Sequence, residues 1–213
     1  MSITINVMLV DDHAVVRAGY NMLLKNAPEI TVVAEANNGE EAYQLYSAHK
    51  PDVVVMDLSL PGIGGIEAIK RICSRDNKAT ILVFSMHEEV IFVEQALQAG
   101  ASGYITKSTD PQLLVEAIIR LAKGEKYIDA ELAQRLAYEK SRGQDSLLSD
   151  LSTREFEIFC MLAEGSNTSE IAKRLCLSYK TVANYSTQIK SKLNVSTIAD
   201  IARLAIRHNI IQA

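Results

Sequence analysis

Three aspartates, one serine and one lysine stand at the ends of short apolar runs. They are Asp11, Asp12, Asp57, Ser85 and Lys107. Three carboxylates brought close together repel one another, which raises their pKa values and favours binding of a cation. A cluster of oxygen ligands with open water positions suits Mg²⁺, which binds through one or two carboxylates and through phosphate oxygens. These residue types therefore predict a magnesium-dependent site for a phosphoryl group.

Asp57 has the position of a nucleophile in this set. It ends the apolar run Val53–Met56 and precedes a proline-glycine turn, which would leave its carboxylate exposed. Such a carboxylate can attack phosphorus and form an aspartyl phosphate. Mg²⁺ and Lys107 would neutralise the phosphoryl oxygens, and the Ser85 hydroxyl can donate a hydrogen bond to them.

Each of these residues also has a structural explanation when it is taken alone. Asp11 and Asp12 could cap the following helix, Asp57 could start the turn, and Lys107 could be an ordinary solvated lysine. The coincidence of all of them at strand ends favours the phosphoacceptor interpretation. We expect His13, which follows the acidic pair, to be a partly exposed residue of the first helical turn and not a metal ligand.

Two hydrophobic periodicities alternate along residues 1–124 and would position these side chains. Short β-branched runs predict five strands, at Ile5–Val10, Ile30–Ala34, Val53–Met56, Ile81–Phe84 and Gly103–Thr106. Helical patterns lie between and after them, at residues 14–26, 39–49, 65–74, 89–99 and 110–123. Apolar strands alternating with helices predict an α/β fold with a five-stranded, parallel, doubly wound sheet. With the flavodoxin-like order 2-1-3-4-5, the four strands that end in polar residues are neighbours and share one edge.

These motifs resemble the receiver domains of two-component response regulators. The resemblance rests on Asp11-Asp12-His13, on Asp57 with the Leu-Pro-Gly that follows it, on Ser85, and on the segment from Gly103 to Lys107. It implies that a histidine kinase phosphorylates Asp57. It also implies that the ligands of Mg²⁺ are Asp11, Asp12, Asp57 and the backbone carbonyl of Ser59.

The same resemblance makes Ser85 and Tyr104 a switch pair. Tyr104 lies three residues before Lys107, which places it on the fifth strand, facing the fourth helix. Phosphorylation is then expected to pull Ser85 toward the phosphate and to let Tyr104 turn inward. Ser108 stands where many receivers have proline, so the sequence gives no reason to expect the cis peptide bond common there.

The strand pattern ends after residue 124, and the remaining chain has helical patterns only. Residues 129–140 predict a short helix, and the polar residues 141–146 predict a linker. Start signals then predict four helices: capping boxes at Ser152–Glu155 and at Asn167–Glu170, an N-cap at Ser178, and an N-cap at Ser196 or Thr197. Cys176 and Leu177 alone separate the second and third of these helices, which is the spacing of a helix-turn-helix.

The third of these helices has side chains of the kinds that contact DNA, and a helix-turn-helix places this helix in the major groove. Asparagine and glutamine can read adenine edges, threonine and tyrosine can reach bases or phosphates, and lysines neutralise phosphates. The expected DNA contacts are Lys180, Thr181, Asn184, Tyr185, Thr187, Gln188, Lys190 and Lys192.

This part of the chain resembles LuxR-type DNA-binding domains. The matching segments include Leu151–Glu155, Glu170–Ala172, Lys180–Val182 and Lys192-Leu193. Joined to a receiver, a four-helix, all-α domain of this type is typical of the NarL/FixJ class of response regulators, and the ending Leu204–His208 is most similar to regulators of the GacA type. Ala183 and Thr187 replace the basic residues usual in the middle of the recognition helix, so no operator sequence is implied.

Length and charge also indicate two modules with different partners. The chain has 213 residues, enough for two small domains. Its net charge of −4 divides into −5 over residues 1–124, −2 over residues 125–150 and +3 over residues 151–213. The expected organisation is a receiver domain over residues 1–124, a linker with a short helix over 125–147 and a DNA-binding domain over 148–213.

Composition excludes several other classes of protein. A hydrophobic content of 48% excludes intrinsic disorder, and no apolar stretch approaches the ~20 residues of a membrane span. The N-terminus has no basic region of a signal peptide. The three cysteines are widely spaced, which favours reduced thiols in a cytoplasmic protein over disulfides or a zinc site.

The sequence therefore predicts a phosphorylation-controlled transcription regulator that catalyses only its own aspartyl phosphorylation and dephosphorylation. Phosphorylation is expected to release the DNA-binding module and to permit dimerisation. The apolar residues of the last helix would form either a two-fold interface or part of the core. These residues are Ile198, Ile201, Ala202, Ala205 and Ile206.

Two other classes of function compete with this interpretation. The first is a signalling adaptor of the receiver type that acts through protein contacts without binding DNA. The second is a Mg²⁺-dependent phosphohydrolase with Asp57 as nucleophile. Such phosphatases often have a second carboxylate two residues later, where this chain has Ser59.

Overall fold

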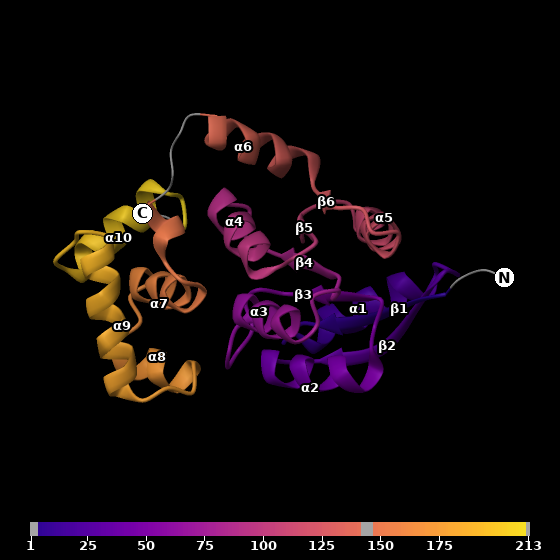
Figure 1. Cartoon of the computed structure of the whole chain (residues 1–213), viewed down its shortest axis with the longest axis horizontal. Helices are drawn as coiled ribbons and strands as arrows, with labels where there is room; N and C mark the ends of the chain where they lie inside the picture. The colour runs from indigo at the N-terminus through magenta and orange to yellow at the C-terminus, as the bar shows by residue number, and fades with distance from the viewer. Residues whose placement is uncertain (1–3, 142–146, 212–213) are drawn as a thin grey trace.

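The structure is a computed structural model that describes residues 4–141 and 147–211, and a parallel sheet forms the centre of its N-terminal half (Figure 1). The strands are β1 (Ile5–Val10), β2 (Ile30–Ala36), β3 (Val53–Met56), β4 (Ile81–Ser85), β5 (Gly103–Thr106) and β6 (Tyr127–Ile128). Their order is β2-β1-β3-β4-β5-β6, which confirms the predicted parallel fold and the order of its first five strands. The two-residue strand β6, which pairs with Gly103 and Tyr104, was not predicted because it is too short for a periodic pattern.

Helices cover both faces of this sheet. They are α1 (Ala14–Lys25), α2 (Gly39–His49), α3 (Gly65–Arg75), α4 (Val90–Ala99) and α5 (Pro111–Ala122). Along β1, Val7 and Leu9 pack in the layer shared with α1 and α5. Met8 and Val10 point to the other face, where α2, α3 and α4 pack. Because successive strand residues alternate between faces, an uninterrupted apolar strand fills both layers.

Local sequence signals set the ends of several of these helices. The Asn38 side chain accepts the backbone N–H of Glu41 and caps α2. Asp110 caps α5, whose first residue is proline. Gly100 ends α4 with φ of 111°, in the left-handed region that favours glycine.

The C-terminal half consists of helices. α6 (Ala130–Ser141) matches the predicted short helix, and the predicted linker residues 142–146 lie outside the described residues. After them come the 3₁₀ helix η1 (Leu147–Asp150) and the helices α7 (Thr153–Ala163), α8 (Thr168–Arg174), α9 (Tyr179–Lys192) and α10 (Ile198–Arg207). The predicted caps are present, and Thr197 rather than Ser196 caps α10. The helix-turn-helix therefore consists of α8 and α9.

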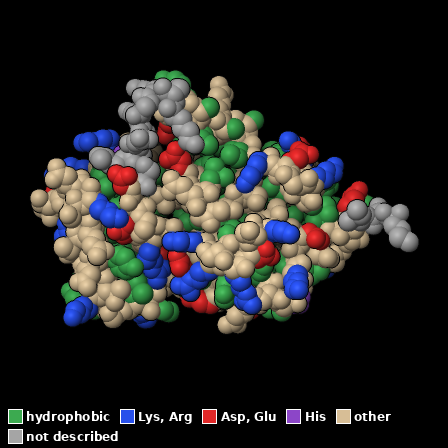
Figure 2. All heavy atoms as spheres, in the orientation of Figure 1, with side chains coloured by type: hydrophobic (Ala, Val, Ile, Leu, Met, Phe, Trp, Pro, Cys, Tyr) green, Lys and Arg blue, Asp and Glu red, His purple; other side chains and the backbone are tan. Residues whose placement is uncertain are grey.

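The two halves pack against each other, with α7 facing α3 and with η1 against α4 (Figure 1). One continuous cluster of buried apolar side chains runs from the α2–α4 face of the sheet into the helical half. Charged side chains of both signs are interspersed over both halves on the face in Figure 2, and hydrophobic atoms surface between them. Within the described residues, no helix is long and apolar enough to cross a membrane.

Candidate functional site

Asp11, Asp57 and Lys107 meet at the carboxyl edge of the sheet, at the ends of β1, β3 and β5. Lys107 Nζ lies 2.6 Å from Asp11 Oδ2 and 2.7 Å from Asp57 Oδ2. All three side chains are less than one-tenth exposed, so the prediction of an exposed Asp57 carboxylate is wrong. Burial alone would lower the pKa of Lys107, but its hydrogen bonds to both aspartates outweigh burial and raise that pKa. Lys107 is therefore a buried cation shared by two carboxylates.

The turn after β3 holds the second oxygen of Asp57. The backbone N–H of Leu58 donates to Asp57 Oδ1 at 2.7 Å, and that of Ser59 approaches the same oxygen at 3.4 Å. α3 then begins against this turn at Gly65, where a Cβ would lie 2.1 Å from the backbone oxygen of Asp57. The carboxylate is thus fixed by its own turn on one side and by Lys107 on the other.

Asp12 and His13 lie at the outer rim of this site. His13 is the N-cap residue of α1, its side chain is 66% exposed, and its Nδ1 lies 2.8 Å from Asp12 Oδ1. Asp11 Oδ1 accepts the His13 backbone N–H at 2.8 Å, so this carboxylate orders the loop. Each of the three residues offers one ligand atom, and these atoms lie within 4.8 Å of one another. The carboxylate oxygens of Asp11 and Asp12 match the oxygen preference of Mg²⁺, whereas an imidazole does not.

Ser85 and Tyr104 are both completely buried, and both lie on strands of the edge that holds Asp57. The Tyr104 hydroxyl donates a hydrogen bond to the backbone oxygen of His87 at 2.8 Å, and burial raises the pKa of this phenol. Ser85 Oγ accepts the backbone N–H of His87 at 3.4 Å. Tyr104 already points inward in this structure, so the two predicted switch residues are joined through the backbone of one loop residue.

Sequence reasoning missed His87, which lies two residues after Ser85. Its Nε2 is 3.2 Å from Ser59 Oγ, in the turn after Asp57. Its ring stacks on Phe92 with ring centroids 3.9 Å apart. Burial lowers the pKa of His87, which favours the neutral imidazole. The only signal in the sequence is a histidine in the loop after the fourth strand, which has no meaning until its neighbours are known.

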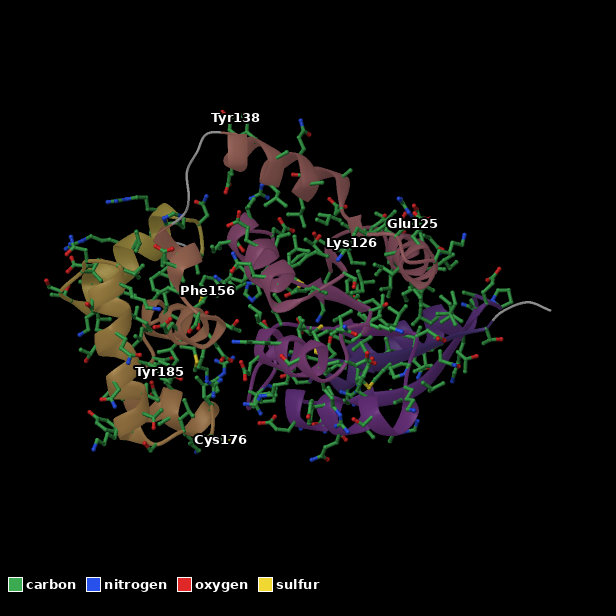
Figure 3. All side chains as sticks on the ribbon, in the orientation of Figure 1. Glu125, Lys126, Tyr138, Phe156, Cys176 and Tyr185 are labelled. Carbon is green, nitrogen blue, oxygen red and sulfur yellow. The ribbon has the colours of Figure 1, made fainter. Side chains whose placement is uncertain are left out.

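The residues predicted to contact DNA divide into two groups on α9. Lys180, Asn184 and Gln188 are exposed and have no side-chain partner among the described residues. The other five contact their own domain. Thr181 is hydrogen-bonded to Ser178, and Thr187 to the backbone oxygen of Ala183. Lys192 binds Glu155 and the backbone oxygen of Asp150, Tyr185 packs against the apolar core, and Lys190 is half-buried. Figure 3 shows Tyr185 on α9 and Cys176 at the turn before it.

Two family models match the chain and cover most of it. The response regulator receiver domain matches residues 7–119, and the LuxR family of bacterial regulatory proteins matches residues 149–205. The chain belongs to the response regulators of the NarL/FixJ class. It is thus a transcription regulator that combines a receiver domain with a LuxR-type DNA-binding domain, as the sequence predicted.

Individual relatives agree with this assignment along the whole chain. The regulator is 42% identical over 209 residues to the transcriptional activator protein ExaE of Pseudomonas putida. The match covers 97% of this chain and 98% of ExaE. It is 38% identical over 211 residues to the response regulator GacA of Pseudomonas aeruginosa, with 98% and 99% covered. This supports the predicted likeness to regulators of the GacA type.

A solved structure gives the same picture. RcsB from Salmonella enterica serovar Typhimurium, bound to the promoter rprA with the phosphomimetic BeF₃⁻, has a TM-score of 0.70 and 27% identity to the regulator. The match covers 94% of this chain and 98% of RcsB. RcsB therefore shares both domains with the regulator.

In the regulator, the loop that follows the Asp57 turn touches the DNA-binding domain. The Gly62 backbone N–H donates to the Arg174 backbone oxygen at 3.2 Å, across the domain boundary. Gly64 lies so close to Glu157 that a Cβ there would be 2.1 Å from Glu157 Oε1. The backbone at Gly64 has φ of 70°, which also favours glycine.

Aromatic rings continue this contact from the receiver into α7. Phe92, which stacks on His87, meets Phe156 edge to face with centroids 5.1 Å apart. Phe156 lies on the side of α7 that faces the receiver (Figure 3). A cavity of about 110 Å³ lies at this interface, and its lining includes Ser59, His87, Phe156 and Glu157. The loop after Asp57 and the DNA-binding domain are therefore in direct physical contact.

Proposed function

We propose that the regulator accepts a phosphoryl group on Asp57 from a histidine kinase. An Asp57 carboxylate oxygen attacks phosphorus and the bond from phosphorus to the kinase histidine nitrogen breaks. The imidazole, which carries a proton on its other ring nitrogen, takes the electron pair of that bond and leaves in its neutral form. Water later hydrolyses the aspartyl phosphate and releases inorganic phosphate. The observation that carries this proposal is the buried Lys107 ammonium, which bonds both Asp11 and Asp57 at the carboxyl edge of the sheet.

The residues that would hold Mg²⁺ are Asp11, Asp12, Asp57 and the backbone carbonyl of Ser59. When bound, Mg²⁺ would neutralise charge on the phosphoryl oxygens and on the crowded carboxylates. Lys107 would contribute the second positive charge, because its ammonium already lies within 2.7 Å of Asp57. The regulator needs no further catalytic group for this, so its only chemistry would be the gain and loss of its own phosphoryl group.

Ser85 and Tyr104 would convert this chemistry into a change of shape. Ser85 would donate its hydroxyl to the new phosphoryl group, and this movement would disturb the hydrogen bond that Ser85 Oγ accepts from His87. His87 also accepts the Tyr104 hydroxyl and stacks on Phe92, which contacts α7. Phosphorylation would thus loosen the contact between the receiver and the DNA-binding domain.

Release of the DNA-binding domain would act by freeing it to reorient and to pair with the same domain of a second chain. Lys180, Asn184 and Gln188 are already exposed in the docked arrangement, so the receiver does not cover them. On α10, Ile201 and Ala205 are buried in the domain core, whereas Ile198 and Ile206 are 41% and 38% exposed. The exposed pair supports a homodimer interface that places two recognition helices on successive half-sites of double-stranded DNA.

We propose the predicted domain organisation, with the receiver over residues 1–124, the linker over 125–147 and the DNA-binding domain over 148–213. The first residues of this linker add β6 to the receiver's sheet. The regulator would work in the cytoplasm, where both double-stranded DNA and the transmitter part of a histidine kinase are present. The alternative, an adaptor that acts through protein contacts only, uses the same receiver chemistry and differs in its lack of DNA binding.

Treatment with acetyl phosphate and Mg²⁺ tests this proposal on the full chain and on Asp57→Ala. We expect the wild type to gain the mass of one phosphoryl group, to elute as a dimer and to bind DNA more tightly. The DNA affinity should fall steeply as salt rises, because lysines displace counterions from phosphates. Asp57→Ala should show none of these changes.

Two outcomes would contradict the proposal in different places. Phosphorylation without DNA binding at any salt concentration would support the adaptor. Absence of a mass gain in the wild type would refute Asp57 as a phosphoacceptor.

A further inference from the structure

Three side chains form a row along the exposed face of the recognition helix. Lys180, Asn184 and Gln188 follow one another at intervals of four residues, so they lie on one side of α9. Each is exposed, and none has a side-chain partner among the described residues. Beside them, Thr187 donates its hydroxyl to the Ala183 backbone oxygen at 3.1 Å. The two amides are therefore the free polar groups in the middle of this face.

The positive charge of α9 indicates that this face binds a nucleic acid. The helix contains three lysines and no aspartate or glutamate. The chain from residue 151 to 213 has a net charge of +3, in contrast to the acidic receiver. Such a helix suits the phosphate-lined major groove, which admits an α-helix.

We infer that Asn184 and Gln188 are the specificity residues of the regulator and that each reads an adenine in the major groove. A primary amide has one donor and one acceptor group side by side. Adenine presents the complementary pair, an N6 donor and an N7 acceptor, whereas guanine presents two acceptors. Lys180 would then supply affinity through a phosphate. This inference rests on the DNA-binding function proposed above.

The spacing of the two amides sets the spacing of the two adenines. Four residues of an α-helix rise about 6 Å, at about 1.5 Å per residue. Successive base pairs are stacked about 3.4 Å apart. The two adenines of one half-site should therefore lie about two base steps apart, and the partner chain should require the same pair in the second half-site.

Binding-site selection from a random double-stranded DNA library tests this inference. The full-length regulator is first phosphorylated with acetyl phosphate and Mg²⁺, and the selected DNA is then compared among variants. We expect wild type to select adenine at two positions of each half-site. Asn184→Ala should lose discrimination at one position, and Gln188→Ala at the other, by about 5- to 100-fold.

Two further variants separate base reading from general affinity. Lys180→Ala should weaken binding to all sequences alike and reduce the dependence of affinity on salt. Ser191→Ala is the control on the same helix, because it removes an exposed hydroxyl that is not among the predicted DNA contacts, and it should leave base preference unchanged.

A variant that prefers a different base tests the inference more strictly than a variant that loses base discrimination. Gln188→Glu keeps the size of the side chain but replaces the donor with a second acceptor, so its position should change from adenine toward cytosine, whose N4 is a donor. Unchanged discrimination in Asn184→Ala and Gln188→Ala, or guanine at the positions that respond, would overturn the inference while DNA binding stands. If the phosphorylated wild type binds no DNA at all, the proposed function itself is refuted.

Discussion

Lys107 forms ion pairs with two carboxylates that lie far apart in the sequence, Asp11 and Asp57. Replacement of this one residue therefore tests how much the three side chains together contribute to the stability of the fold. Its ammonium donates one hydrogen bond to Asp11 and one to Asp57. All three side chains are less than one-tenth exposed. Removal of one partner from such a group leaves charge buried without compensation, which costs more than an exposed ion pair contributes.

We predict that Lys107→Ala lowers the free energy of unfolding by about 3 kcal/mol at pH 8. Without the ammonium, the Asp11 and Asp57 carboxylates repel each other and lose the hydrogen-bond donor that they share. Urea unfolding of the variant and of the wild type measures this effect.

The control for this prediction is Lys123→Ala, which removes an exposed lysine at the end of α5. It should change the free energy of unfolding by less than about 0.5 kcal/mol. A loss of stability for Lys107→Ala no larger than that for Lys123→Ala would contradict the explanation by carboxylate repulsion.

Residue types and their order were sufficient to predict that Asp11, Asp57 and Lys107 share one edge of the sheet. Each follows an apolar strand, and parallel strands bring their carboxyl ends together. His87 could not be found in this way. Its role depends on the 3.2 Å approach to Ser59 and on a ring stacked on Phe92, neither of which leaves a pattern in the sequence.

Among the elements, α7 has the most unusual environment, because it belongs to one domain and packs against the other. Its residue Glu157 lies at this contact, beside Gly64 of the receiver. Burial raises the pKa of Glu157 to about 7, and this effect outweighs the nearby Arg154, which lowers it. Glu67 of α3 raises the same pKa and Arg174 of α8 lowers it.

We predict that protonation of Glu157 favours docking of the two domains. When the domains separate, the carboxyl is solvated and its pKa returns toward the ordinary value of 4.5. The docked form therefore binds more protons between these two pKa values, and lower pH favours it. Relative to Glu157→Gln, the docking equilibrium of the wild type should strengthen about tenfold from pH 8 to pH 6.

Small-angle X-ray scattering of unphosphorylated wild type and Glu157→Gln measures the docked fraction. Burial also lowers the pKa of His87, which would make docking weaker at lower pH. Both proteins contain this imidazole, so a comparison with Glu157→Gln removes its contribution to the docking equilibrium. A constant ratio between the two proteins across this pH range would refute the prediction.

Capping residues predicted the starts of α7, α8 and α9 because a cap is a local signal, confined to four residues. The Ser152 and Asn167 capping boxes are both formed in the structure. Strand β6 was missed for the opposite reason. Two residues have no period, and Tyr127 and Ile128 form a strand only because β5 offers them an edge.

For the molecule as a whole, a buried polar contact fastens the receiver to η1. Gln95 of α4 is 1% exposed, and its Nε2 donates to the backbone oxygens of Leu148 and Leu151 at 3.5 Å and 3.4 Å. We predict that Gln95→Ala weakens docking by about 1 kcal/mol, or about fivefold. DNA affinity without phosphorylation should rise by up to the same factor.

Gln98→Ala is the matched control, because it makes the same change on the exposed side of the same helix. Titration of both unphosphorylated variants with DNA at constant salt provides the measurement. Equal affinities for the two variants would show that this contact does not restrain the DNA-binding domain.

The arrangement of the two domains was beyond the reach of sequence reasoning. Phe92 and Phe156 each fit a helical pattern, and that pattern is fully explained by burial inside one domain. Nothing in the period of either helix indicates that the two rings touch across a domain boundary. Shape complementarity between two finished surfaces decides that contact.

The apolar cluster that runs without interruption through both domains also determines how the molecule melts. Side chains that share one core lose their packing together, so the unphosphorylated regulator should unfold in a single calorimetric transition. If phosphorylation separates the domains as proposed, each keeps only its own share of that core, and two transitions should appear, with the smaller DNA-binding domain melting first. The phosphorylated regulator would therefore be less resistant to heat than the unphosphorylated one.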